Sequence, residues 1–330
     1  MRLVFCGTPQ FAVPALQHLL AQKDFGVAAV ITQPDRARGR GQEVSFSPLK
    51  EAALAAGVPV HQPEKIRQPD AQELLQRIAP DAIVIIAYGQ IIPARLLPIP
   101  RLGWINLHAS LLPKYRGAAP INWAIVNGET TTGVTTMRID AGMDTGDMLL
   151  QREMEIGAAE TAPELAARMA ELGAPLMAET LRGLAAGTIM PRAQNHAEAS
   201  IAPMLKREFG LLDWSLTATK IFNRIRGFAP WPGAYTHFRG QLCHIWGEPA
   251  LDGSNPNEGT SVSANLSPGQ AAENSQPGAL HAERDSLFVL CGGATRLRLT
   301  AVKLEGRKQV SAAEFLRGAR LQPGERFGQN

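Results

Sequence analysis

A continuous apolar run at Asp81–Ala87 constrains the fold of this 330-residue chain more than any other stretch. A strand with one face in water alternates apolar and polar residues, so an unbroken run predicts a strand covered on both faces. Near the amino terminus, strand-like segments at 2–6 and 27–33 enclose an apolar-rich helical segment at 11–20. Strand, helix and strand in that order are typical of a parallel sheet. We therefore expect an α/β fold for the first half of the chain.

Two polar residues stand where the next strand of this sheet is expected to end. Asn106 and His108 have alternate spacing, which directs both side chains to one face of a strand. Ligands of open α/β sheets bind beyond the carboxyl ends of the strands, so the loops after Ala87 and Ile105 are expected at one crevice. Asp144, in a Gly-rich segment between two further strand-like runs, adds a carboxylate. An amide, an imidazole and a carboxylate at strand ends favour acyl-type chemistry. The alternative is that His108 is a core residue with satisfied hydrogen bonds.

The residues after His108 favour the functional interpretation, and other chemistries lack their signatures. The run Pro113–Gly117 (Pro-Lys-Tyr-Arg-Gly) is typical of a substrate loop, and no core packing needs it. The first turn of the expected sheet has only Gly7 in place of GxGxxG, which disfavours a dinucleotide cofactor. Ser110 has no GxSxG setting, so we expect no covalent nucleophile.

The composition is that of a soluble globular protein, with 45% hydrophobic and 19% charged residues. No run approaches the roughly 20 apolar residues of a membrane span, and residues 1–7 resemble a sheet strand rather than a signal peptide. The three cysteines are far apart and form no CxxC pair, which disfavours a zinc site and a disulfide framework. We expect a cytoplasmic monomer with no metal and no membrane partner.

The sequence changes character beyond residue 189, and the length of the chain favours two domains. Residues 190–206 are polar and broken by prolines, which predicts a linker between a domain at 1–189 and another at 207–330. The second region has short strand-like runs between turns, as in a small β-barrel. Within it, 252–276 has almost nothing to bury, so we expect a flexible insertion. Residues 190–330 hold 16 Lys and Arg against 12 Asp and Glu, an excess that permits a polyanionic partner.

Three arginines, Arg36, Arg38 and Arg40, alternate with small residues and have no apolar neighbour to anchor them. One interpretation is a solvated, mobile loop. The other is an exposed cationic loop that reaches phosphates, which the forked guanidinium group suits well.

Three motifs together resemble a known family. They are Asn106-x-His108, the Ser110–Gly117 run Ser-Leu-Leu-Pro-Lys-Tyr-Arg-Gly, and Asp140-x-Gly142-x-Asp144-x-Gly146. This set resembles the formyltransferases that use 10-formyltetrahydrofolate. Gly7-Thr8-Pro9 near the start and Pro230-Trp231-Pro232-Gly233 in the second half are similar to the branch that formylates methionyl-tRNA. The resemblance covers the whole chain apart from 252–276.

The resemblance implies a fold, two substrates and a set of site residues. It implies a Rossmann-like formyltransferase domain followed by an OB-like β-barrel domain that helps to bind tRNA. The donor would be 10-formyltetrahydrofolate, and the acceptor would be the amino group of initiator methionyl-tRNA, formylated for translation initiation. The implied catalytic residues are Asn106, His108 and Asp144. The implied folate site consists of Ser110, Leu111, Leu112 and Pro113 together with Ala87, Tyr88 and Gly89. The basic residues expected to contact tRNA are Arg36, Arg38, Arg40, Lys206 and Arg207.

Other functions stay open at this point. The same catalytic residues would suit a formyltransferase for a small amine, such as a glycinamide ribonucleotide or an amino sugar. That function would leave the arginine loop and the second domain unused. A non-catalytic RNA-binding protein with a relic first domain is a third possibility, and the intact Asn106, His108 and Asp144 argue against it. A folate deformylase that uses water is a fourth.

Overall fold

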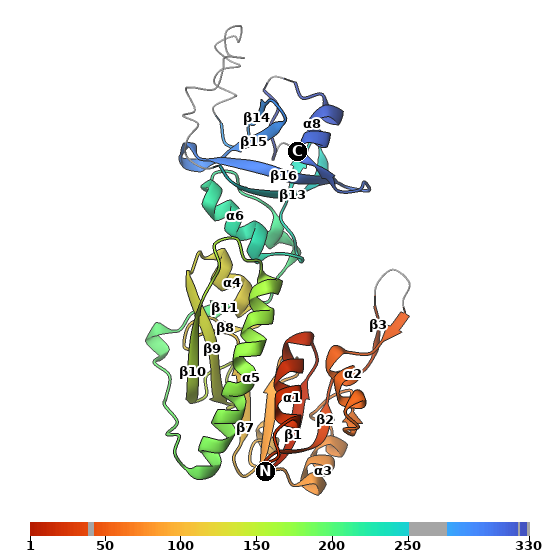
Figure 1. Cartoon of the computed structure of the whole chain (residues 1–330), viewed down its shortest axis with the longest axis vertical. Coiled ribbons are helices and arrows are strands. Elements are labelled where there is room, and N and C mark those ends of the chain that lie inside the picture. The colour runs from red at the N-terminus through yellow and green to blue at the C-terminus, as the bar shows by residue number, and fades with distance from the viewer. Residues whose placement is uncertain (39–42, 251–275, 323, 329–330) are drawn as a thin grey trace. The chain divides into compact units, whose positions relative to one another are not determined.

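Strand β6 lies at the centre of a seven-stranded sheet, between β7 and β1, in the computed structural model of the chain (Figure 1). The structure describes residues 1–38, 43–250, 276–322 and 324–328. They divide into two compact units, the first made of 1–121, 130–157 and 164–203, and the second of 122–129, 158–163 and 204–330.

The sheet of the first unit has the strand order β10-β9-β7-β6-β1-β2-β5. The five strands from β7 to β5 in this order are parallel, whereas β9 is antiparallel to β7 and β10 is antiparallel to β9. The strands span β1 Arg2–Gly7, β2 Gly26–Ile31, β5 Val60–His61, β6 Ala82–Ile86, β7 Trp104–His108, β9 Thr131–Arg138 and β10 Met148–Glu155. All five residues of β6 are buried, as the apolar run predicts. The predicted α/β fold is confirmed.

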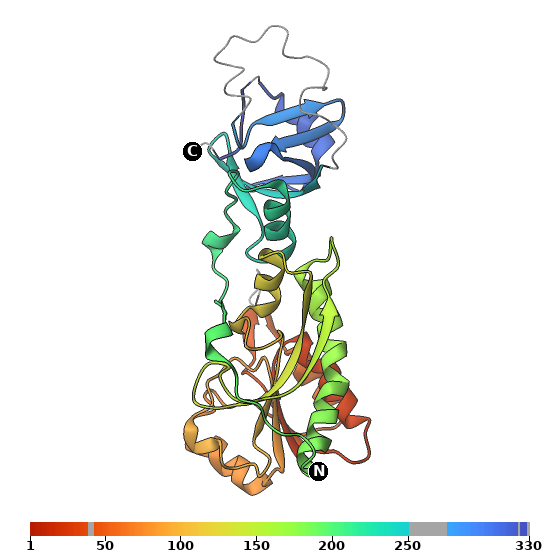
Figure 2. The same ribbon diagram turned by 90° about the vertical axis from the view of Figure 1, so that its left-hand side faces the viewer.

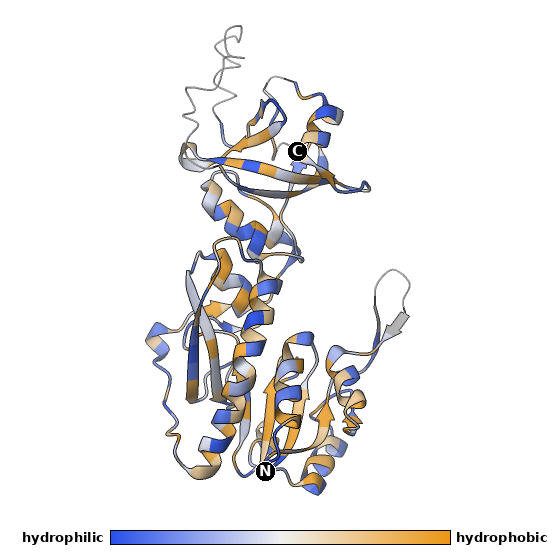
Figure 3. Cartoon of the chain, viewed as in Figure 1, coloured by the Kyte–Doolittle hydropathy of each residue, from blue (hydrophilic) through white to orange (hydrophobic). Residues whose placement is uncertain are grey.

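Helices cover both faces of this sheet, as Figure 2 shows with α3 on one side and α1 and α5 on the other. The helices are α1 Val13–Leu20, α2 Pro48–Ala55, α3 Pro69–Ile78 and α5 Ala162–Ala186. Ala71 and Leu75 of α3 belong to one hydrophobic cluster with the β6 residues Ile83 and Ile85. Because the central strands β1 and β6 are buried, they are mainly hydrophobic in Figure 3, whereas β10 and the helices also carry hydrophilic residues.

The second unit is an antiparallel β domain, which confirms the predicted β fold of the second half. Its strand order is β12-β13-β16-β15-β14, and β17 pairs with β16. The strands span β12 Tyr235–Phe238, β13 Gln241–Pro249, β14 Leu280–Glu283, β15 Ser286–Leu290, β16 Arg296–Leu304 and β17 Val310–Ser311, and the helices span α6 Ala218–Gly227 and α8 Ala312–Ala319. Thr217 caps α6 and Ser311 caps α8, each accepting a hydrogen bond from a backbone N–H of the first turn. The predicted insertion at 252–276 lies outside the described residues, apart from Gln276.

Most of one helix from the first half of the chain belongs to the second unit. This is α4, Pro120–Val126, which enters the second unit at Asn122. Trp123 meets Phe209 and Phe228 edge to face, with ring centroids 5.3 and 5.6 Å apart, and Asn122 Nδ2 donates to the Gly227 oxygen at 2.7 Å. The second unit is therefore not a continuous segment of the chain.

The segment predicted as a linker packs largely on the first unit. Arg192 pairs with Met148 of β10, and β11 (Ile201–Ala202) forms a parallel pair with β8 (Arg116–Gly117). The chain leaves the first unit after Pro203. Residues 190–203 therefore run beside the loops that carry the candidate site residues.

The cysteine side chains in both units are buried free thiols, and burial raises the pKa of Cys243 and of Cys291 to about 12. No helix in the described ranges is long and apolar enough to cross a membrane.

Candidate active site

Strand β7 presents Asn106 and His108 on the same face of the sheet. They are 9% and 5% exposed, and Asn106 pairs with Ile85 of β6 in the strand register. Within the described part of the chain, the Asn106 amide has no hydrogen-bond partner. An amide that is mostly buried and unpartnered retains donors and an acceptor for a ligand.

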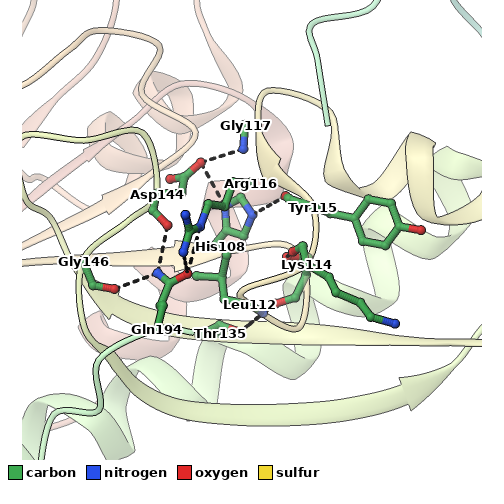
Figure 4. A network of polar contacts seen from close by, with 11 residues as sticks. His108, Leu112, Lys114, Tyr115, Arg116, Gly117, Thr135, Asp144, Gly146 and Gln194 are labelled. Atoms are coloured by element: carbon green, nitrogen blue, oxygen red, sulfur yellow. Dashed lines mark hydrogen bonds and ion pairs between the residues drawn. The ribbon is translucent and has the colours of Figure 1, made fainter. Parts of the chain in front are cut away.

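His108 is fixed by contacts at both ring nitrogens (Figure 4). Its Nε2 atom lies 2.8 Å from the backbone oxygen of Tyr115. A carbonyl oxygen only accepts hydrogen bonds, so Nε2 is the donor. The Nδ1 atom lies 3.7 Å from Oδ2 of Asp144, and this contact brings the predicted imidazole and carboxylate together.

Asp144 lies in the loop between β9 and β10 with a left-handed backbone, φ 52°. Its Oδ2 atom accepts a hydrogen bond from the Gly117 N–H at 2.8 Å. The side chain is 17% exposed, so the carboxylate remains open to a ligand. Asp140, by contrast, bonds within the loop to the Gly142 N–H and the Thr145 hydroxyl. Asp140 is therefore a turn residue.

The loop at Ser110–Gly117 is held by its own backbone and by β9. Ser110 Oγ donates to the Lys114 oxygen at 2.6 Å. Thr135 of β9 donates to the Ser110 oxygen at 2.7 Å and accepts from the Leu112 N–H at 3.1 Å. Tyr115 has a positive φ of 61°, a conformation that residues with side chains rarely adopt outside such constrained sites. The loop is therefore fixed in place before any substrate binds.

The Ala87–Gly89 segment follows β6, next to β7 in the sheet. Ala87 and Gly89 have positive φ angles of 47° and 83°. The Tyr88 side chain is 2% exposed within the core, where burial raises the pKa of its phenol. Its backbone oxygen accepts a hydrogen bond from Gln33 Nε2 at 3.0 Å. The tyrosine ring is therefore a core side chain, and the backbone of this segment follows the carboxyl end of β6.

The basic residues predicted to contact tRNA are divided between the two units. Arg36 is exposed on β3 (Arg36–Arg38), which pairs with β4 (Glu43–Ser45). Arg40 lies outside the described residues. Lys206 and Arg207 belong to the second unit, where both are exposed and Lys206 lies 3.9 Å from Glu208.

Arg116 and Gln194, which the sequence analysis did not identify individually, are central to the hydrogen-bond network around Asp144. Arg116 was expected within a substrate loop, but its side chain is 6% exposed and its Nε and Nη2 atoms donate to Gln194 Oε1. Gln194 lies in the segment predicted as a linker, and it is also 6% exposed. Its polar neighbours in sequence carry no periodic pattern that could have revealed this burial.

The chain matches known proteins over nearly all of its length. The formyl transferase family model matches residues 1–181, and the model of the formyl transferase C-terminal domain matches 204–320. The chain is 52% identical over 329 residues to the methionyl-tRNA formyltransferase of Solibacter usitatus, which covers 100% of this chain and 99% of the relative. It is 50% identical over 329 residues to that of Acidobacterium capsulatum, with 99% and 100% covered.

A solved structure supports the fold. An N-formyltransferase from Helicobacter canadensis, in complex with folinic acid and dTDP-3-aminofucose, is 18% identical with a TM-score of 0.60. The match covers 90% of this chain and 98% of that chain. From the full-length identity to these relatives, and from both family matches, the chain belongs to the methionyl-tRNA formyltransferase family.

Proposed function

We propose that the chain transfers the formyl group of 10-formyltetrahydrofolate to the amino group of initiator methionyl-tRNA, for translation initiation. The observation that carries this proposal is the meeting of His108 and Asp144 at 3.7 Å, with Asn106 on the same strand, in a chain 52% identical to a methionyl-tRNA formyltransferase. We also propose that it acts as a monomer in the cytoplasm, where its buried free thiols would remain reduced.

The residues beyond β6 and β7 fit a folate donor. The unpartnered Asn106 amide offers N–H donors from a mostly buried position. The segments Ala87–Gly89 and Ser110–Pro113 would hold the donor, because their backbones are already fixed by hydrogen bonds from Gln33 and Thr135. When bound, the donor supplies the activated formyl group.

The chemistry requires one bond to form and one to break. The amine nitrogen of the acceptor bonds to the formyl carbon, and the bond from that carbon to the folate nitrogen breaks. The amine loses a proton and the folate nitrogen gains one. The Asn106 amide would donate to the formyl oxygen as negative charge develops there. His108 at Nδ1 and Asp144 would carry the proton away from the amine, directly or through water.

The basic residues would contact the phosphates of the tRNA. Three of them are exposed: Arg36 in the first unit, and Lys206 and Arg207 in the second. When such residues bind phosphates, the counterions condensed on the nucleic acid are released. We include Arg38 and Arg40 in the same proposal. The second unit would then provide acceptor affinity, while the chemistry stays with the first unit.

A mass measurement tests the proposal. Charged initiator tRNA is incubated with the protein and the formyl donor, and the aminoacyl group is released and weighed. Formylmethionine is the expected product, and His108→Ala serves as the inactive control. Glycinamide ribonucleotide and an amino-sugar nucleotide are assayed in parallel. A higher kcat/KM for either small amine would replace the tRNA with that acceptor, and formate release without an acceptor would indicate a deformylase. Binding of tRNA without any turnover would indicate a non-catalytic RNA-binding protein.

A further inference from the structure

Gln194 joins a buried arginine to the loop that carries Asp144. Its Nε2 atom donates to the backbone oxygens of Asp144 at 2.8 Å and of Gly146 at 2.7 Å. Its Oε1 atom accepts from Arg116 Nε at 3.0 Å and from Arg116 Nη2 at 2.7 Å. Figure 4 shows this bridge beside His108. Gln194 lies between the two stretches that the family models match.

The partners of Gln194 fix the direction of its amide. A guanidinium group only donates, and a backbone carbonyl only accepts, so the amide cannot be reversed. Both of its N–H bonds have acceptors, and its oxygen has two donors. Because the side chain is buried, water cannot readily replace these partners.

The arginine end of the bridge is itself anchored. The Arg116 N–H donates to the Ser200 oxygen at 2.8 Å, where β8 pairs with β11. Its Nη1 atom donates to Nδ1 of His196, 3.1 Å away. Gln194 therefore connects the Asp144 loop to the paired strands β8 and β11 through Arg116.

The loop end of the bridge sets the direction of a functional carboxylate. Asp144 has a left-handed backbone, and a Cβ added at Gly146 would lie 2.0 Å from the Arg138 oxygen. Gln194 bonds the carbonyl of Asp144 itself and the carbonyl two residues later. A rotation of either peptide group would move the Asp144 carboxylate away from His108, which it meets at only 3.7 Å.

We propose that Gln194, held by Arg116, is a positioning residue for formyl transfer. It fixes the backbone of the Asp144 loop so that the carboxylate stays beside His108. It acts through Asp144, and neither Gln194 nor Arg116 touches the reacting atoms. The inference rests on the proposed function, because that function supplies the assay.

The variant Gln194→Glu separates the two halves of the bridge. A glutamate has the same shape and retains the bonds from Arg116, but it has no N–H for the Asp144 and Gly146 carbonyls. We expect kcat to fall at least tenfold at a temperature where the variant is folded, with the KM for tRNA and for the formyl donor within twofold. The Tm should also fall, because two mostly buried carbonyls lose their donor. Asn195→Asp is the matched control, since it makes the same chemical change at an exposed neighbour. Its kcat should stay at the value of the unsubstituted protein.

A double substitution tests whether Gln194 acts through Asp144. In an Asp144→Ala background, Gln194→Glu should lower kcat by less than twofold, because the group that it positions is already absent. A full tenfold loss in that background would overturn the inference, as would an unchanged kcat in the single variant. A loss confined to KM would also overturn it, because that would indicate a binding role.

Amide exchange gives a readout that does not depend on turnover. The Gly117 N–H donates to the Asp144 carboxylate, so its hydrogen exchange should become faster in Gln194→Glu and in the apolar variant Gln194→Met. Unchanged protection in a folded variant would contradict the proposed positioning. Absence of formylmethionine with the unsubstituted protein would instead refute the proposed function, and the exchange comparison would still decide the role of Gln194.

Discussion

The Nε2 atom of His108 lies 2.8 Å from the backbone oxygen of Tyr115, whose φ angle is 61°. Because this carbonyl requires a donor, the proton of a neutral His108 ring resides on Nε2. The other nitrogen, Nδ1, then faces Asp144 and can accept a proton. The conformation of the loop at Ser110–Gly117 therefore leaves Nδ1 as the ring nitrogen available for the proton transfer that we propose.

Alanine at Asn106, His108 or Asp144 should lower kcat at least about a hundredfold, since one lost hydrogen-bond donor at comparable sites costs about 3 kcal/mol. The side chains lie at the end of β7 and in one loop, so the fold should survive. Single-turnover rates and thermal melts measure the two effects separately. A variant with a nearly normal single-turnover rate would show that its residue has no catalytic role.

Gly117→Ala should damage both the fold and the rate. A Cβ at this position would lie 2.7 Å from the Ala202 oxygen, and the backbone φ of 116° is unfavourable for residues with side chains. The strain should separate β8 from β11 and weaken the hydrogen bond from Gly117 to Asp144. We expect a lower Tm together with a lower kcat. Gly57→Ala is the control, because it has a positive φ but no atom within 4 Å of an added Cβ. It should lower the Tm and leave kcat unchanged.

Arg36→Ala should raise the KM for methionyl-tRNA severalfold and leave the KM for the formyl donor unchanged. The reason is a lost phosphate contact, which should also make the dependence of log KM on log salt less steep. Arg152→Ala is the control, since Arg152 is an exposed arginine that pairs with Glu179. Equal effects of the two variants on tRNA use would argue against a specific contact at Arg36.

Glu325→Gln should destabilise the protein near neutral pH but not in acid. Hydrogen bonds from Arg239 hold the pKa of Glu325 below its usual range, so the folded state favours the ionised carboxylate. This stabilisation is present above the ordinary glutamate pKa of about 4.3 and is lost as the pH falls through the lower folded pKa. Since the pair is partly exposed, the difference should be about 1 kcal/mol or less at pH 7. Melting curves of both proteins at pH 7 and pH 3 check this, and a difference that persists at pH 3 would contradict it.

Much of the fold could be predicted because its signals are local in sequence. The apolar run that contains β6 has no polar interruption, and Ser47-Pro48 marks the start of α2 with a cap and a proline. The alternate spacing of Asn106 and His108 fixes them on one face of β7. These features depend on periodicity and on helix-end chemistry, which neighbouring residues determine.

The remainder depends on contacts between residues far apart in the sequence. Gln194 has the same chemistry as an exposed glutamine, and only its meeting with Arg116, 78 positions away, makes it a buried residue. Tyr88 directly follows the apolar run, so the sequence could not tell whether its ring enters the core or faces a ligand. The short strand β14 offers too few residues for a distinct periodic pattern.

The contacts of α4 with the carboxyl-terminal end of α6 determine which chain segments two related proteins could exchange by recombination. Trp123 and Asn122 contact Phe228 and Gly227, so the second unit includes most of a helix encoded in the first half of the gene. A chimera joined after Pro203 would combine one parent's α4 with the other parent's α6, and a join near residue 187 would also place the other parent's residue at position 194. An exchange of the whole second unit would require the matching residues at 122–129 and 158–163 to move with the carboxyl-terminal segment. Recombination that preserves the second unit would therefore have to exchange three separate segments of the chain together.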